Sequence, residues 1–275
     1  MSQTEAAVEL RAGNLTCYFV RHGERVDHVD ESWAQTAPAP YDPPLTQEGR
    51  RQAQRTGALI CRLEQEGEGA GAAQQTSYRI LTSPFLRCAQ TAEELYRGFR
   101  REECAQGSSS SKGSPWMVAV EPGLSEVLSE NYFAQRPPDG IIAARRGEIA
   151  GGAVCDGMAH DDAYVAARDA LPGYPEHFQD MMARFVATLD YVAGTLLAAD
   201  GPRQVVVLVT HGAGINALLW ATARQLRGSD VPYCCLSRAR VVSRLPQQPS
   251  DAPRMPGHMW AVDYQAYSEH LFPRL

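Results

Sequence analysis

The sequence lacks the features that mark several protein classes. No run of eighteen apolar residues could cross a membrane, and residues 1–12 carry no apolar core of a secretory signal. The net charge of −6 and the pI near 5.7 leave no basic excess, so neither a nucleic acid nor an anionic membrane is expected as a partner. The seven cysteines form no C-x-x-C pair, which argues against a zinc cluster and a disulfide framework. We therefore expect a cytoplasmic protein in a reducing compartment, without a membrane span.

Several catalytic motifs are also absent or incomplete. Neither a P-loop nor the G-x-S-x-G turn of serine hydrolases occurs. Residues 212–217 fit the G-x-G-x-x-A spacing of dinucleotide-binding proteins, but no second strand ending in an acidic residue follows at the required distance. Cys234 and Arg240 fit the C-x5-R spacing of cysteine phosphatases, but no glycine between them could shape a phosphate-binding loop. We expect Cys234 to be a buried strand residue.

The elements that are present predict one α/β domain over residues 1–275. A hydrophobic content of 44% supports a substantial core in a chain of this length. Apolar, β-branched runs predict strands at 15–20, 78–82, 116–120, 204–210, 231–242 and 258–264, the run at 204–210 being typical of a central parallel strand. Helical spacing predicts helices from Thr46 as N-cap to 63, from Ser83 as N-cap to 101, over 178–196 and over 213–224, with Phe178 among the core residues.

The segments between these elements are expected to be loops. Residues 1–13 read as a flexible leader, and the low-complexity stretches at 64–76 and 105–114 as flexible loops. Residues 130–175 show no sustained period and are interpreted as a cap inserted between core elements, where substrate preference is often decided.

Two histidines follow predicted strands in the same way. Arg21, His22 and Gly23 end the first strand, and His211 with Gly212 ends the strand at 204–210. Ligands bind at the carboxyl ends of strands in open α/β sheets, so the two imidazoles are expected in one pocket. Glycine after a histidine allows a tight bend or the approach of an anion to backbone N–H groups.

Further charged residues fall at the ends of other strands. Arg25 follows the first histidine, and Arg87 lies in the first turn of a helix, where a nearby anion would offset the unfavourable dipole. Glu121 and Glu126 follow the strand at 116–120, and Glu126, which lies past the turn, can point into the shared crevice. The pattern indicates a phosphate site in an acidic protein, with His22 either positioning a ligand or accepting a phosphoryl group.

In this order, the motifs resemble those of the histidine phosphatase superfamily, also called phosphoglycerate mutase-like. The resemblance rests on V-R-H-G-E-R at 20–25, P-L-T at 44–46 with Gly49, S-P-F-L-R-C-A-Q-T-A at 83–92, V-E-P-G-L-S-E at 120–126 and V-T-H-G at 209–212. It is strongest toward the phosphatase domains of suppressor of T-cell receptor signalling proteins and ecdysteroid phosphate phosphatases. It implies a three-layer α/β/α sandwich with a mostly parallel central sheet and an inserted cap.

The resemblance also implies roles for single residues. His22 would be the nucleophile, Glu126 the acid and then the base, and Arg21, Arg25, Arg87 and His211 would hold the phosphoryl oxygens, with His211 counted among the catalytic groups. No metal and no cofactor is expected, and the substrate would be a phosphorylated small molecule or phosphoprotein. The alternatives are a non-catalytic relative that binds phospho-ligands or a partner, and a mutase-type phosphotransferase. The sequence leaves the oligomeric state open, a homodimer included.

Overall fold

A seven-stranded sheet forms the middle layer of the protein. The structure, a computed structural model, describes residues 14–67, 75–107, 116–197, 202–228, 231–244 and 257–272. The strands are β1 (Leu15–Arg21), β2 (Thr76–Thr82), β3 (Met117–Val120), β4 (Ala159–His160), β5 (Arg203–Thr210), β6 (Leu236–Arg244) and β7 (His258–Tyr267), in the order β4-β3-β2-β5-β1-β6-β7. All pairings from β4 to β1 are parallel, whereas β6 and β7 add antiparallel strands. The predicted mostly parallel sheet is confirmed.

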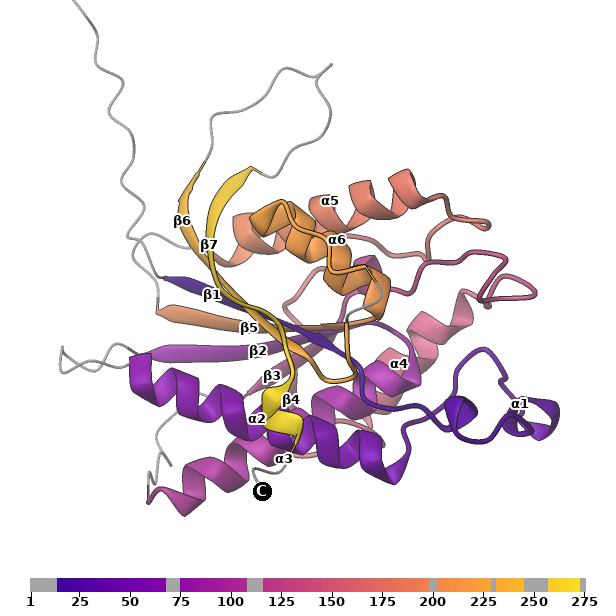
Figure 1. The fold of residues 1–275 in the computed structure, drawn as a ribbon, viewed down its shortest axis with the longest axis horizontal. Helices are drawn as coiled ribbons and strands as arrows, with labels where there is room; N and C mark the ends of the chain where they lie inside the picture. Colours follow the sequence, from indigo (N-terminus) through magenta and orange to yellow (C-terminus); the bar gives the residue numbers. More distant parts are fainter. Residues whose placement is uncertain are drawn as a thin grey trace, which may run out of the picture.

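Helices cover both faces of this sheet (Figure 1). One face carries α2 (Gln47–Gly67), α3 (Leu86–Ala105) and α4 (Gly140–Ala150), and the other carries α5 (Phe178–Leu196) and α6 (Gly212–Ala223). Short helices lie at α1 (Trp33–Thr36), η1 (Val26–His28), η2 (Pro122–Leu124) and η3 (Glu269–Leu271). The side chains of β1 alternate between the two cores, with Tyr18 and Val20 in one, and Cys17 and Phe19 in the other. The three-layer fold is therefore confirmed.

The helix starts show where local sequence decides structure and where it does not. Thr46 caps α2 as predicted, because its hydroxyl oxygen accepts a hydrogen bond from the N–H of Gly49 at 2.9 Å. The predicted N-cap at Ser83 is wrong, since α3 begins at Leu86. The N–H of Leu86 instead donates to Asp42 Oδ1 at 2.6 Å, so the cap comes from a distant loop.

Two predicted segments differ from what the structure shows. Helix α2 runs through Gly67 into the loop expected at 64–76, because Glu64 is buried and accepts hydrogen bonds from Tyr18 and Arg203. The segment 130–175 contains α4, and its strand β4 pairs with β3, so part of the expected cap belongs to the sheet. The leader at 1–13, residues 68–74 and residues 108–115 lie outside the described residues.

Helix α5 starts where it was predicted, but its first residue does not lie in the core. Phe178 begins the helix and is 61% exposed, so its predicted place in the core is wrong.

The sequence indicates neither a membrane span nor a disulfide framework, and both points can be compared with the described part of the chain. None of the helices within it has an apolar stretch long enough to cross a membrane. All seven cysteines lie in it, and each carries a free thiol.

Candidate active site

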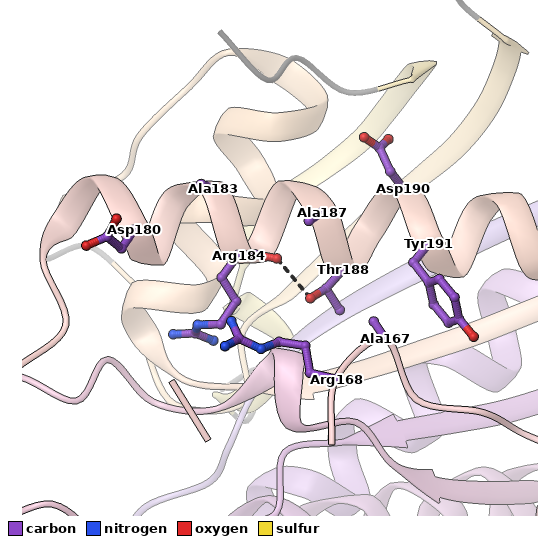
Figure 2. A pocket seen from close by; sticks show the side chains of 9 residues that line it. All are labelled: Ala167, Arg168, Asp180, Ala183, Arg184, Ala187, Thr188, Asp190 and Tyr191. Atoms are coloured by element: carbon purple, nitrogen blue, oxygen red, sulfur yellow. Dashed lines mark hydrogen bonds between the residues drawn. The ribbon is translucent and has the colours of Figure 1, made fainter. Parts of the chain in front are cut away.

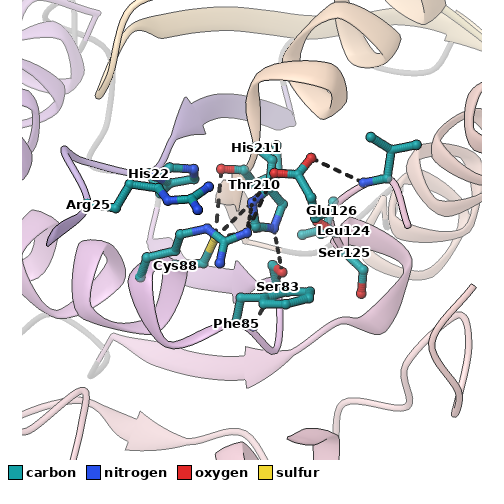
Figure 3. A network of polar contacts seen from close by, with 12 residues as sticks. His22, Arg25, Ser83, Phe85, Cys88, Leu124, Ser125, Glu126, Thr210 and His211 are labelled. Carbon is teal, nitrogen blue, oxygen red and sulfur yellow. Dashed lines mark hydrogen bonds and ion pairs between the residues drawn. The ribbon is translucent and has the colours of Figure 1, made fainter. Parts of the chain in front are cut away.

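The two predicted histidines lie side by side at the carboxyl ends of β1 and β5. The strands pair in parallel with Arg21 opposite Thr210, so the residue after each strand reaches the same place. The N–H of His22 donates to the carbonyl of Thr210 at 2.9 Å, and the imidazole centroids of His22 and His211 are 5.3 Å apart. Both side chains are buried. Parallel pairing thus unites residues 189 positions apart in one pocket (Figure 3).

The hydrogen bond of His22 fixes its tautomer. Its Nδ1 lies 2.8 Å from the carbonyl oxygen of Gly23, and because a carbonyl can only accept, Nδ1 must carry the proton. Nε2 therefore keeps a lone pair. Burial, together with the charges of Arg87, His211 and Arg21, holds the pKa of His22 well below its ordinary value of 6.5, so the ring is neutral. A neutral imidazole with a free Nε2 is a nucleophile.

His211 is held at both ring nitrogens. Its Nε2 lies 2.9 Å from the hydroxyl oxygen of Ser83, and its Nδ1 lies 3.2 Å from both Arg87 Nη2 and Glu126 Oε2. Burial lowers the pKa of His211 to about 4 against the opposing effect of Glu126. The buried ring is thus fixed in orientation, and it also begins helix α6, whose N-terminal dipole favours an anion.

Arg87 is a buried arginine of the pocket with hydrogen-bond donors that have no partner among the described residues. Its side chain is 1% exposed, yet Nε and Nη1 have no hydrogen-bond partner among the described residues. Nη2 alone meets polar groups, with Glu126 Oε2 at 3.5 Å. Burial and the neighbouring Arg25 both lower the pKa of Arg87, which shows that the pocket carries excess positive charge. Buried donors are almost always satisfied, so two free ones favour an anionic ligand.

The other two predicted arginines, Arg21 and Arg25, already contact other groups of the protein. Arg21 donates from Nη1 to the carbonyl of Val231, its guanidinium lies 4.2 Å from the ring centroid of Tyr233, and its buried Nε has no partner in the described part of the chain. Arg25 is paired with Asp27, with Nε 2.7 Å from Oδ1. Figure 3 shows Arg25 beside His22. Arg21 therefore keeps one buried donor without a partner among the described residues, whereas Arg25 is already bound to an acid.

The two candidate glutamates have different environments. Glu121 is buried, and its carboxylate accepts hydrogen bonds from Gly123 N, Tyr164 Oη and Ala167 N, each at 2.7 Å. It fastens the segment after β4 to the turn after β3. Glu126 reaches the pocket, where burial alone would raise its pKa but His211 and Arg87 lower it to about 2. Only Glu126 can act on a ligand.

Gly23 allows close packing of the loop, and its N–H does not contact an anion. Its N–H donates to Thr91 Oγ1 at 3.0 Å, so this group is not free for a ligand. A Cβ at Gly23 would lie 2.4 Å from the carbonyl oxygen of Gly49 in α2. Glycine is required because the loop that carries His22 passes directly against the start of that helix.

The side chains of the pocket could bind either a metal ion or an anion, and the charge of the pocket decides which of the two fits better. His22, Glu126 and His211 each place a ligand atom within 4.8 Å of the others, which would suit a divalent cation. However, Arg21 and Arg87 lie close enough to His22 to lower its pKa, and both hold buried donors without a partner among the described residues. Positive charge and free N–H groups attract oxyanions and repel cations, so the site suits a phosphoryl group better.

Sequence reasoning missed three residues of this site. Ser83 was interpreted as a helix cap but orients His211, Tyr233 stacks under Arg21, and Thr210 donates to the carbonyl of Leu124 at 2.8 Å, which positions the turn before Glu126. Ser83 and Thr210 stand within motifs of the family resemblance, which could have indicated them. No local signal marks Tyr233, since it is brought in by a turn between α6 and β6.

The rejected C-x5-R motif is not a second catalytic site. Cys234 is fully buried, which raises its pKa well above the ordinary value. Arg240 points elsewhere and pairs with Asp263, with Nη2 3.0 Å from Oδ1. Arg145, which lies in the segment interpreted as a cap, is buried, and its guanidinium is bound to Asp42, Glu148 and the carbonyl of Pro84.

A larger cavity of about 670 Å³ lies along helix α5, away from the histidines (Figure 2). Arg184 lines it, but its guanidinium is bound to Glu176 and to the carbonyls of Gly123 and Ser125. This arginine holds the turn that carries Glu126 in place. The cavity contains none of the predicted site residues and offers no nucleophile.

A family model described as the histidine phosphatase superfamily (branch 1) matches residues 17–104. This stretch contains His22 and the arginines at 21, 25 and 87. No curated protein matches the chain significantly in sequence. The matched stretch contains three of the five motifs on which the resemblance rests, those at 20–25, 44–46 and 83–92.

Solved structures of related architecture cover nearly the whole chain. Ecdysone phosphate phosphatase from Bombyx mori is 20% identical, with a TM-score of 0.54 over 87% of this chain and 97% of that one. Phosphoglycerate mutase from Bacillus anthracis is 14% identical, with a TM-score of 0.47 over 94% and 95% of the two chains. A mycobacterial glucosyl-3-phosphoglycerate phosphatase is 20% identical, with a TM-score of 0.49 over 92% and 99%. At such identities the first of these likenesses establishes the fold alone.

Proposed function

Because the chain matches the histidine phosphatase superfamily over the stretch that carries His22, we propose that it is a metal-independent phosphomonoesterase acting through a phosphohistidine. The observation that carries this proposal is the pairing of a neutral His22, whose Nε2 is unprotonated, with unsatisfied donors on Arg21 and Arg87. One side of the pocket supplies the nucleophile, and the other neutralises the phosphoryl oxygens. No metal is needed for either task.

Binding places the phosphoryl group between the imidazoles. Arg87 donates from Nε and Nη1, and Arg21 from Nε, to the equatorial oxygens, while His211 and the start of α6 complete the cradle. These donors are fixed before the ligand arrives, so they cost no reorganisation during the reaction. Removing one such donor typically lowers the rate about a hundredfold to a thousandfold.

The reaction then proceeds in two displacements. In the first, the lone pair of His22 Nε2 forms the N–P bond while the P–O bond to the leaving group breaks, and Glu126 gives a proton to the departing oxygen. In the second, Glu126 takes a proton from water, the water oxygen bonds to phosphorus, and the N–P bond breaks. Free phosphate leaves, and both residues return to their starting states.

Glu126 must carry a proton for the first displacement. In the free pocket its pKa is about 2, because His211 and Arg87 outweigh the effect of burial. A phosphoryl dianion placed between these cations and Glu126 opposes their effect and raises the pKa of the carboxyl group. The substrate therefore creates the protonated acid that its own leaving group requires.

The test is phosphate release from an aryl phosphate by protein treated with EDTA. We expect full activity after the treatment, none in His22→Ala, and unchanged activity in His160→Ala, a histidine paired with Asp162 outside the pocket. A quench in alkali, where the N–P bond of a phosphohistidine is stable, should reveal a labelled enzyme that loses its label when the sample is acidified. Full activity in His22→Ala, or complete loss in EDTA, would refute the mechanism.

The same assay separates the alternatives. A protein that only binds phospho-ligands would be stabilised by phosphate but release none from any ester. A mutase-type phosphotransferase would convert one phosphorylated isomer into another without accumulating free phosphate. We place the phosphatase in the cytoplasm and expect its substrate to be a phosphorylated small molecule or phosphoprotein.

A further inference from the structure

Each of the two pocket arginines that keep a free buried donor lies over an aromatic ring. The guanidinium carbon of Arg21 is 4.2 Å from the ring centroid of Tyr233, and that of Arg87 is 4.6 Å from the ring centroid of Phe85. Both distances are within the range of a cation–π interaction. Nε of Arg21, and Nε and Nη1 of Arg87, have no partner among the described residues. The rings therefore contact the cations without using these donors.

The same two rings also contact the two histidines. The ring centroid of Tyr233 is 5.7 Å from that of His22, and the ring centroid of Phe85 is 5.4 Å from that of His211. Each ring thus touches one imidazole and one guanidinium of the pocket. Tyr233 belongs to the segment between α6 and β6, whereas Phe85 directly precedes α3. One arrangement is therefore built twice, from segments that are far apart in the sequence.

Arg25 shows what an acidic partner does instead. Asp27 accepts hydrogen bonds from both Nε and Nη2 of Arg25. A carboxylate stabilises a buried guanidinium, but it occupies the donors and cancels the charge that a phosphoryl oxygen would otherwise meet. The face of an aromatic ring carries partial negative charge, so it attracts the cation and leaves the donors in the guanidinium plane free. A ring therefore suits an arginine whose donors serve a ligand.

We propose that Tyr233 and Phe85 are positioning residues, which hold the guanidiniums of Arg21 and Arg87 in the orientation that binds a phosphoryl group. The inference rests on the proposed function, because it takes a phosphoryl group as the ligand of the free donors. Neither ring touches the reacting atoms, so each acts through its arginine.

Backbone contacts keep Tyr233 beside Arg21. The carbonyl of Val231 accepts from Nη1 of Arg21, and the N–H of Cys234 donates to the carbonyl of Arg21 at 3.1 Å. The hydroxyl of Tyr233 is hydrogen-bonded to Nδ1 of His28. The ring face and the hydroxyl have different partners, so their effects can be tested separately. Tyr233 is only partly buried, so we expect its variants to fold.

Binding of inorganic phosphate, measured by calorimetry, and turnover of an aryl phosphate report the effect of the ring. Tyr233→Leu should weaken phosphate binding and lower kcat/KM by about fivefold to thirtyfold, the range expected for a cation–π contact shielded from water. Tyr233→Phe keeps the ring face and should recover most of this loss. Trp220→Leu is the matched control, because Trp220 lies 4.8 Å from the guanidinium of Arg224 outside the pocket, and it should change neither quantity.

A double-mutant cycle separates positioning from a merely structural role. Arg21→Met removes the cation, so adding Tyr233→Leu to this variant should change kcat/KM by less than about twofold. Phe85→Leu should likewise have little effect once Arg87→Met is present. If Tyr233 acted on His22, or only held the loop in place, its loss would have the same effect in both backgrounds.

The outcomes distinguish this inference from the proposed function. Equal losses in both backgrounds, or phosphate binding by Tyr233→Leu as tight as that of the parent, would overturn the positioning role and leave the phosphatase intact. Release of phosphate from no ester by the parent protein would overturn the phosphatase function. Weaker binding of inorganic phosphate by Tyr233→Leu would in that case still support the role of the ring in an anion pocket.

Discussion

Arg87 should stabilise the bound phosphate but lower the free energy of unfolding of the protein without phosphate. Two of its buried donors have no partner among the described residues, and each unsatisfied buried donor costs roughly 1–3 kcal/mol. Arg87→Met keeps the packing of the side-chain stem near Phe85 and removes both donors. Glu126 is not left alone, because His211 Nδ1 remains 3.2 Å away and the N–H of Val127 still donates to it.

We therefore expect Arg87→Met to raise the free energy of unfolding by about 1–3 kcal/mol in phosphate-free buffer, while kcat/KM falls at least about a hundredfold. Phosphate at a hundred times its dissociation constant should add about 2.7 kcal/mol to the stability of the parent protein. The variant should gain little from phosphate, because its main donors are gone. Urea unfolding at pH 7 with and without phosphate measures the stabilities, and phosphate release from an aryl phosphate measures kcat/KM.

Arg145 offers a matched control in the same protein. It is also a buried arginine, but its guanidinium is fully used by Asp42 Oδ2 at 2.8 Å, the carbonyl of Pro84 at 3.0 Å and Glu148. Arg145→Met leaves the buried Asp42 without its partner and should lower stability by about 3–5 kcal/mol. The reasoning fails if both variants are destabilised equally, or if Arg87→Met responds to phosphate as strongly as the parent.

Three other predictions concern packing, pH and catalysis. Gly57→Ala should lower the thermal unfolding midpoint, since its Cβ would lie 2.0 Å from the carbonyl oxygen of Leu95, whereas Gly147→Ala in α4, with nothing within 4 Å, should raise it slightly. Burial and nearby arginines lower the pKa of His270 to about 4 from 6.5 in the unfolded chain, so stability should fall as the pH drops from 6.5 to 4. His270→Asn should flatten that part of a urea-unfolding series, and an unchanged slope would contradict the assignment. Glu126→Gln should slow hydrolysis of alkyl phosphates far more than that of nitrophenyl phosphate, whose leaving group needs no proton; equal losses in steady-state kinetics would exclude Glu126 as the acid.

Much of the fold followed from local patterns. The strands at 15–20 and 204–210 were predicted within about one residue, because continuous apolar, β-branched runs have few alternatives to a buried parallel strand. The strand predicted from 231 begins only at Leu236, since Cys234 adopts a left-handed conformation with φ 51° that interrupts the extended chain. Pro232 is the local signal for a break in this segment, but nothing in the residue types at 233–235 marks the left-handed position itself.

The site was less predictable where a local signal and a tertiary contact compete. Thr46 and Ser83 carry the same helix-start signal, but His211 lies against the hydroxyl of Ser83, and Asp42 caps the helix instead. Glu121 and Glu126 both follow the end of β3 in sequence, and the packing of Glu121 against the segment around Tyr164 distinguishes it as the structural one. Such choices depend on partners more than forty residues away.

The two contacts of the Asp42 carboxylate limit how the sequence around α4 can change. One oxygen of its carboxylate holds the first N–H of α3, whose next residue is Arg87, and the other holds Arg145 of α4. The loop that precedes α2 is thus tied both to the start of α3, which carries Arg87, and to α4. Exchange of the segment around α4 between relatives would have to preserve this one acid and its arginine, or the start of α3 would shift and carry Arg87 out of reach of the substrate.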